Sequence, residues 1–247
     1  HDREKRIHPL KDDKILTDWN GLMIAALATG ARILNKSEYA KAARRAADFI
    51  LSKMRDQNGR LYHRFRDGEL AVEAHAGDYA FLIHGLLSLY QTTYDLTFAE
   101  GAKVLQEKMM ERFWDEENGG FFSTPIDGDE LPVRPKELYD GAIPSANSVA
   151  LSNLVFLFRL TRDPSWEKRA EAQIRAFAGT VKSQPQAFTF FLCALDFALR
   201  PGQDIITDGL QIIEGQATAH VCRNGSCTDS TSDTQTMVNK ILGKHGG

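Results

Sequence analysis

A repeat with a spacing of 60 residues constrains the fold of this chain more than any other feature. Asn58-Gly59 recurs as Asn118-Gly119, and Asp67-Gly68 recurs as Asp127-Gly128. Further pairs at the same spacing are Leu61-Tyr62 with Phe121-Phe122 and Asp18-Trp19 with Asp78-Tyr79. A fixed period of this size indicates that one supersecondary unit is stacked along the chain. The predicted unit is a pair of helices, with turn-bearing loops between successive pairs.

Two kinds of apolar segment alternate along the repeat. Some are apolar around most of a helix circumference, which predicts burial on all sides: residues 22–34, 79–90, 149–160 and 187–199. Others have one apolar stripe opposite charged side chains: residues 38–54, 98–113 and 166–181. Inner helices of two concentric rings touch neighbours everywhere, whereas outer helices touch only the inner ring. The pattern therefore predicts an all-α fold, an α/α toroid.

The connections between these segments differ in length and composition. Links from a buried to a one-faced segment are short, whereas the reverse links are long and contain Asn-Gly and Asp-Gly hairpin signals. All long loops should therefore lie on one face, together with the starts of the inner helices, and we expect function there. We assign residues 1–202 to the toroid portion. Residues 203–247 form a small C-terminal α/β appendage, with short strands and a terminal helix at 237–242.

Charge and cysteine content exclude several classes of protein. The formal net charge is -3, so nothing in the composition favours nucleic acid or an anionic membrane as a partner. No apolar run reaches the ~18 residues that a membrane span requires. The 3 cysteines are too few for a disulfide scaffold and favour a reducing compartment, so we expect the cytoplasm. Cys222 and Cys227 lack the Cys-x-x-Cys spacing, and we expect no metal and no cofactor.

Three aspartates lie at or just before the starts of inner helices, namely Asp18, Asp78 and Asp140. In a toroid these positions surround the mouth of one central cavity. Two carboxyl groups close together suit acid/base or nucleophilic chemistry on a sugar. Aspartate is also among the best N-cap residues, so each of the three has a purely structural alternative.

Other polar and aromatic residues accompany these aspartates. Trp19, Asn20 and Tyr79 suit stacking on a sugar ring and hydrogen bonding to it, although aromatic residues at helix starts also serve packing. Residues 139–148 contain more polar positions than one N-cap needs, and they include Ser145 and Asn147. Arg134 is either a ligand-binding arginine or a solvated loop residue. His75 lies three residues before Asp78 and is a candidate general base.

Four motifs give the chain a family resemblance. They are residues 13–24, Asp-Lys-Ile-Leu-Thr-Asp-Trp-Asn-Gly-Leu-Met-Ile; residues 78–83, Asp-Tyr-Ala-Phe-Leu-Ile; residues 119–122, Gly-Gly-Phe-Phe; and residues 140–148, Asp-Gly-Ala-Ile-Pro-Ser-Ala-Asn-Ser. Through these motifs the chain resembles the YyaL or spermatogenesis-associated protein 20 family. The resemblance implies a toroid of the six-hairpin glycosidase type, incomplete here, that follows an upstream thioredoxin-like domain in the same protein. Gly77 stands where the family tends to have a second acidic residue.

These observations lead to a hypothesis about function. We expect a carbohydrate-active toroid that acts on a small sugar or sugar derivative, with Asp78 and Asp140 as the acid/base pair. Trp19 and Tyr79 would stack on the sugar. The binding groups would be Asp18, Asn20, Arg134, Ser145 and Asn147. Glycoside hydrolysis and epimerisation or isomerisation both fit, and for epimerisation His75 is the nearest base.

The competing hypothesis is a non-catalytic scaffold. Such a module would bind a ligand or partner and serve the upstream thioredoxin-like domain. An incomplete ring also exposes two apolar flanks, so we expect self-association of the chain.

Overall fold

The computed structural model describes residues 2, 5–8, 11–128, 132–200, 203–206, 212–213, 216–217, 220–223 and 226–227, and for those after 200 the backbone alone. This part of the chain contains seven α-helices: α1 (Thr17–Leu34), α2 (Ser37–Lys53), α3 (Ala76–Thr93), α4 (Leu96–Phe113), α5 (Ala146–Thr161), α6 (Pro164–Ser183) and α7 (Thr189–Leu199). A short 3-10 helix at Pro185–Ala187 precedes α7. All the helices predicted from the 60-residue repeat are present.

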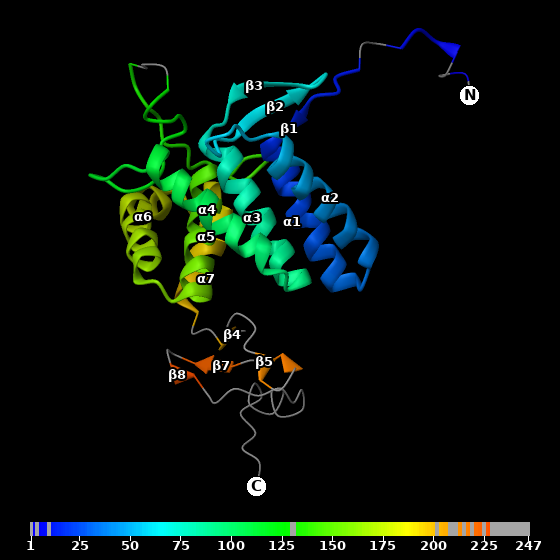
Figure 1. The fold of residues 1–247 in the computed structure, drawn as a ribbon. Coiled ribbons are helices and arrows are strands. Elements are labelled where there is room, and N and C mark those ends of the chain that lie inside the picture. The colour runs from blue at the N-terminus through cyan, green and yellow to red at the C-terminus, as the bar shows by residue number, and fades with distance from the viewer. Residues whose placement is uncertain are drawn as a thin grey trace.

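The helices pack side by side (Figure 1), and their contacts arrange them in an inner and an outer row. In the inner row α1 packs against α3, α3 against α5, and α5 against α7, while α2, α4 and α6 each cover the inner helix that precedes them. The middle of the inner row is the best buried, since Leu82, Ile83 and Leu86 of α3 have no exposed surface. The predicted fold is confirmed: this is part of an α/α toroid.

The first inner helix departs from the prediction of burial on all sides. Trp19, Met23 and Ile33 are 62, 56 and 72% exposed and lie along one side of α1. The helix packs against α2, α3 and the strands at its N-terminal end, and the described residues leave this side uncovered. An apolar sequence therefore does not bury an inner helix unless a neighbour stands on each flank. Whether this flank causes self-association stays a prediction.

A small antiparallel sheet lies at the N-terminal end of the inner row (Figure 1). Its strands are β1 (Ile15–Leu16), β2 (Tyr62–Arg66) and β3 (Glu69–Glu73), in the order β1-β2-β3. The turn between β2 and β3 consists of Asp67 and Gly68, with φ of 51° and 85°. Two positive φ angles in succession are typical of a type I′ hairpin turn, which the Asp-Gly signal predicted.

The same local structure recurs one repeat later. An isolated bridge joins Arg55 to Leu61 in the first unit, and a second joins Trp114 to Phe121 in the next. Gly119 has a φ of +73° and lies so close to α6 that an added Cβ would stand 2.9 Å from the carbonyl oxygen of Ala172. The close packing and the positive φ both require glycine at this position. The 60-residue repeat is therefore a repeat of loop structure as well as of helices.

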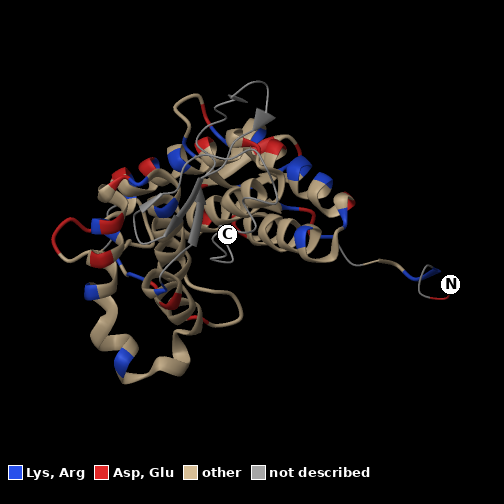
Figure 2. Ribbon diagram, turned by 90° about the horizontal axis from the view of Figure 1, so that it is seen from below, with Lys and Arg blue, Asp and Glu red and all other residues tan. Residues whose placement is uncertain are grey.

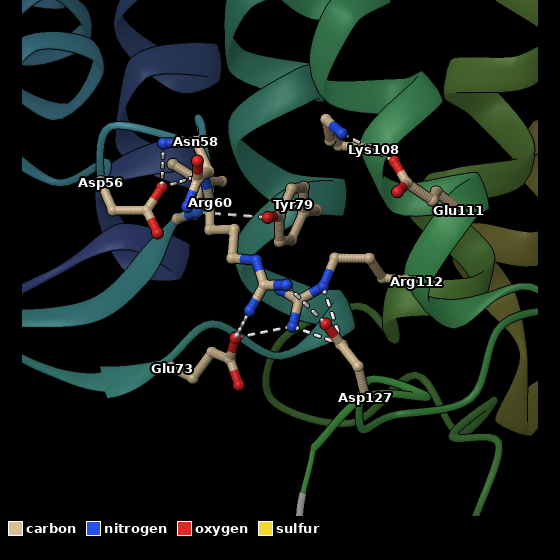
Figure 3. Close-up of polar contacts among 10 residues, drawn as sticks. Asp56, Asn58, Arg60, Glu73, Tyr79, Lys108, Glu111, Arg112 and Asp127 are labelled. Carbon is tan, nitrogen blue, oxygen red and sulfur yellow. Dashed lines mark hydrogen bonds and ion pairs between the residues drawn. The ribbon is translucent and has the colours of Figure 1, made fainter.

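A group of four charged residues fixes the hairpin to the helices (Figure 3). Arg112 of α4, whose side chain is 4% exposed, contacts Glu73 at 2.6 Å and Asp127 at 2.7 Å. Arg60 contacts Asp127 at 2.8 Å. Burial opposes the charge on Arg112, but the hydrogen bonds to Asp127 and Glu73 outweigh it and raise its pKa. This cluster holds the end of β3 in place immediately before α3 begins.

The C-terminal segment contains the short strands expected there. They are β4 (Gln203–Ile206), β5 (Ile212–Ile213), β6 (Gln216–Ala217), β7 (His220–Arg223) and β8 (Ser226–Cys227). β4, β7 and β8 form one sheet in that order, and β5 pairs with β6. The terminal helix predicted at 237–242 lies outside the described residues, and the boundary of an appendage at 203 stays a prediction.

Basic and acidic residues are interspersed along the helices of the toroid portion (Figure 2). This distribution agrees with the small net charge of -3. None of the helices in the described ranges is both long and apolar enough to cross a bilayer.

Candidate functional site

Asp78 is the centre of the strongest candidate site. It lies in the first turn of α3 and is 1% exposed. Its Oδ1 accepts hydrogen bonds from the backbone N–H of Asp18 at 3.1 Å and from Nδ1 of His63 at 2.8 Å. Its Oδ2 accepts the backbone N–H of His75 at 2.8 Å. One carboxylate thus joins the starts of α1 and α3 to strand β2.

Two histidines lie on either side of this carboxylate. The side chain of His63, on β2, is 27% exposed, and that of His75, just before α3, is 51% exposed. Their ring centroids are 6.0 Å apart with the ring planes at 88°. The hydrogen bond to Asp78 raises the pKa of His63, with burial acting in the opposite direction. Since Nδ1 of His63 is bonded to Asp78, Nε2 is the ring nitrogen that remains for a ligand.

Asp18 and Trp19 complete the site at the start of α1. Asp18 is half-buried; burial raises the pKa of its carboxyl group, and the negative charge of Asp78 adds to the effect. One of its oxygens accepts the backbone N–H of Trp19 at 2.7 Å. The indole of Trp19 is 62% exposed. The site thus consists of four titratable groups, Asp18, His63, His75 and Asp78, and the residue next to Asp18 carries an exposed aromatic ring, Trp19.

Two other residues predicted for this region have structural roles. Tyr79 has no exposed surface, its ring contacts Phe113 with centroids 5.4 Å apart, and its hydroxyl oxygen accepts the N–H of Leu61 at 3.2 Å. It belongs to the core and offers no surface for a sugar to stack on. Asn20 uses its amide to bind the carbonyl oxygen of Leu16 at 2.8 Å, which ties α1 to β1.

Asp140 lies in a second, separate group. Its carboxylate accepts the backbone N–H groups of Ser145 at 2.8 Å, Phe190 at 2.8 Å and Phe191 at 3.1 Å. It therefore caps the start of α7 and holds the loop before α5. The contacts of Asp78 and Asp140 are with different groups, and their pairing in catalysis stays a prediction.

The remaining predicted residues hold the long loop before α5. Ser145 is the N-cap of α5, where its hydroxyl accepts the N–H of Ser148 at 3.1 Å. Asn147 is 1% exposed and exchanges two hydrogen bonds with the backbone of Phe121, at 2.8 and 2.9 Å. Arg134 donates to the carbonyl oxygen of Thr124 at 2.6 Å. Each of these side chains thus has a structural role in the loop, although among the described residues Nε of Arg134 is buried without a hydrogen-bond partner, and their part in ligand binding stays a prediction.

Sequence reasoning missed His63. The signal was present in the alternation of β2, where His63 and Phe65 lie two residues apart and so face the same side of the strand. Phe65 packs against the core, so this side faces the helices. A histidine on the inward side of a hairpin beside a helix start was therefore recognisable, although its contact with Asp78 was not.

The same cluster is suited to an ion. His63, His75 and Asp78 each offer one ligand atom, and these atoms all lie within 4.8 Å of one another. Asp18 is close enough to interact electrostatically with both Asp78 and His63.

Solved structures define the class of fold. A cellobiose 2-epimerase from Bacillus thermoamylovorans superposes with a TM-score of 0.57 at 21% identity, over 69% of this chain and 46% of that one. A D-mannose isomerase superposes with a TM-score of 0.56 at 19% identity, over 69% of this chain and 42% of that one. A family 76 glycoside hydrolase, an α-mannanase from Bacteroides thetaiotaomicron, superposes with a TM-score of 0.56 at 17% identity, over 90% of this chain and 64% of that one. Identities this low establish only the fold, which is that of the α/α-toroid epimerases and glycosidases.

Sequence comparison finds homologues of this chain among proteins named spermatogenesis-associated protein 20. Spermatogenesis-associated protein 20 of Homo sapiens is 29% identical over 285 residues, 94% of this chain and 36% of that protein. The same protein of Rattus norvegicus is 32% identical over 208 residues, 80% of this chain and 26% of that protein. The chain is a homologue of these proteins, which confirms the resemblance seen in its motifs, and it spans about a third or less of their length. No protein-family model matches the chain.

Proposed function

We propose that this chain is the sugar-binding part of an α/α-toroid epimerase or isomerase, with His63 as the group that moves a proton on the sugar. The observation that carries the proposal is the 2.8 Å contact between Nδ1 of His63 and the buried carboxylate of Asp78. Such a contact orients the imidazole and leaves Nε2 directed to a ligand. The fold shared with a cellobiose 2-epimerase and a D-mannose isomerase supports a sugar as that ligand.

Three other residues near Asp78 have roles in this proposal, namely Trp19, His75 and Asp18. Trp19 offers a flat apolar surface on which one face of a sugar ring can stack. His75, with half of its side chain exposed, can exchange a proton from a second direction. Epimerisation removes a proton from the carbon beside a carbonyl group and returns one to the opposite face, so two groups on different sides of the carbon suit it. Asp18 is placed to bind a hydroxyl group.

Hydrolysis of a glycosidic bond fits this site less well. It requires two carboxyl groups that both reach the bond, about 5–9.5 Å apart. Asp78 is 1% exposed and already accepts three N–H groups, so it cannot also contact the substrate. Asp18 is then the only carboxyl group of this cluster that remains for the sugar. One accessible carboxyl group and two histidines favour proton transfer at carbon.

The test uses solvent exchange. The full chain, freed of metal with EDTA, is screened for thermal stabilisation by mono- and disaccharides, because a bound ligand raises the melting temperature. Each sugar that stabilises the chain is then incubated with it in D2O, and loss of the proton on the carbon beside the carbonyl group is followed by NMR. Exchange at that carbon supports the proposal. Release of monosaccharides from a disaccharide without exchange would contradict it.

One observation favours the scaffold as a second candidate. Asp140, Asn147 and Arg134 all bind backbone groups of this chain, so three of the predicted site residues already have structural partners. The scaffold would bind the upstream thioredoxin-like domain that the family resemblance implies. It predicts no stabilisation by any sugar in the screen.

A further inference from the structure

The cluster around Asp78 has the donor set of a metal site. Nδ1 of His63 lies 2.8 Å from Oδ1 of Asp78, and Nδ1 of His75 lies 4.0 Å from Oδ2. The two imidazole planes are nearly perpendicular, at 88°. One nitrogen of each imidazole and one oxygen of the carboxylate lie within 4.8 Å of one another, with His63 supplied by β2 and the other two residues by the start of α3.

The spacing suits an ion after a small side-chain movement. Around a tetrahedral zinc ion, with bonds of about 2.0–2.2 Å, ligand atoms stand about 3.3–3.5 Å apart. The 2.8 Å from His63 to Oδ1 and the 4.0 Å from His75 to Oδ2 lie on either side of that value, and binding requires one carboxylate oxygen to come within reach of the same ion as both rings. His75 can make the adjustment by rotation because half of its side chain is exposed.

The carboxylate is already held in place for coordination. The backbone N–H groups of Asp18 and His75 bind its two oxygens at 3.1 and 2.8 Å. Hydrogen bonds of this kind orient a metal ligand and sustain affinity. The local charge also favours a cation. Asp18 and Asp78 bring two carboxyl groups together with two histidines, and among the described residues no Lys or Arg contacts Asp78.

We infer that His63, His75 and Asp78 bind one divalent transition-metal ion of the zinc type. Two imidazoles and one carboxylate favour Zn²⁺ or Co²⁺ over Mg²⁺ and Ca²⁺, which prefer oxygen ligands. Three protein ligands leave a fourth position for water or a sugar oxygen.

The inference rests on the same site as the proposed function and adds a form of regulation to it. For Nδ1 of His63 to coordinate the ion, that nitrogen must lose its proton, and the ring carries its remaining proton on Nε2. The hydrogen bond between His63 and Asp78 is then replaced by two bonds to the metal. An occupied site lacks the free imidazole that the proposed proton transfer requires, so the ion inhibits that reaction.

Titration calorimetry of the EDTA-treated and desalted full chain with ZnCl2 tests the inference. We expect one ion per chain, and with CoCl2 the visible absorption of a cobalt site with nitrogen and oxygen ligands. His63→Gln and His75→Gln should each weaken zinc binding at least about tenfold, which is the lower end for loss of a supporting group around a metal. His8→Gln is the matched control, because His8 lies outside the cluster, and it should bind as the parent chain does. A large excess of MgCl2 should not displace the zinc.

The outcomes separate this inference from the proposed function. Zinc binding that is absent from the parent chain, or as strong in both cluster variants as in the parent chain, overturns the metal site, provided that circular dichroism shows the variants folded. The sugar exchange assay is run in EDTA, so its result does not depend on the ion. Exchange without zinc binding leaves the proposed function standing alone, and zinc binding without exchange leaves the metal site standing alone. If both occur, added ZnCl2 should suppress exchange in the parent chain, and undiminished exchange at saturating zinc would overturn the regulatory part.

Discussion

Asp78 and Asp140 stand at similar points of successive repeats, near the starts of α3 and α5, but their partners differ. Asp78 accepts one imidazole N–H and two backbone N–H groups, whereas Asp140 accepts three backbone N–H groups. The first therefore orients a side chain that reaches the surface, and the second completes a helix start. The comparison shows that the carboxylate alone does not mark a site. The site is marked by His63, the partner that the β2–β3 hairpin brings to Asp78.

The largest effect should follow from removal of that partner. His63→Gln is expected to lower proton exchange on the sugar by about 10²–10⁴-fold, the usual contribution of a general acid or base. The unfolding free energy should change little, because the ring is partly exposed. NMR exchange rates and urea denaturation measure the two quantities. An unchanged exchange rate in the folded variant would show that the contact with His63 does not give Asp78 a function that Asp140 lacks.

The second expected effect concerns the other aspartate. Asp140→Ala leaves three N–H groups without their acceptor and should lower the free energy of unfolding by about 2–3 kcal/mol. Exchange per folded molecule should stay near that of the parent chain. Asp140→Asn keeps one acceptor oxygen and should lower the free energy of unfolding by less than Asp140→Ala does. A variant as stable as the parent but inactive would place Asp140 in the chemistry instead.

A smaller effect is expected in acid, at the beginning of the loop that leads to Asp140. Burial opposes the charge of Asp115, but Lys136 at 2.6 Å and the N–H groups of Asn118 and Glu117 outweigh it and lower its pKa. A lowered pKa in the folded chain means that ionised Asp115 stabilises it above about pH 4, the unfolded value, and that this contribution is lost as the pH falls further. Asp115→Asn should therefore flatten the decline in stability between about pH 4 and pH 2. Urea midpoints across this range give the slope, and an equal slope in both chains would contradict the assignment.

The smallest effect concerns the exposed ring of Trp19 at the start of α1. Trp19→Ala should weaken sugar binding by about 0.5–1.5 kcal/mol, or about twofold to tenfold in Kd. Met23→Ala, on the same uncovered side of α1, is the control for a general effect of that flank. Equal losses in both variants would assign Trp19 to the apolar flank and not to a ligand.

Helix order, the two rows and the face that carries the long loops could be predicted, because they follow from local apolar periodicity and turn residues. The exposure of Met23 and Ile33 could not, since it depends on a missing neighbour and not on the helix's own sequence. Among the site residues, Asp78 and Asp140 look alike in sequence. The contact that separates them comes from His63, 15 residues before Asp78, and depends on how the hairpin folds over α3.

The most direct test of this difference is a comparison of Asp78→Asn with Asp140→Asn in the sugar exchange assay. Rates are measured in EDTA and divided by the folded fraction from circular dichroism, so that loss of stability does not count as loss of function. The structure predicts that exchange per folded molecule is lost with Asp78→Asn and kept with Asp140→Asn. Equal rates in the two variants would contradict the assignment of the His63–Asp78 pair as the reactive centre.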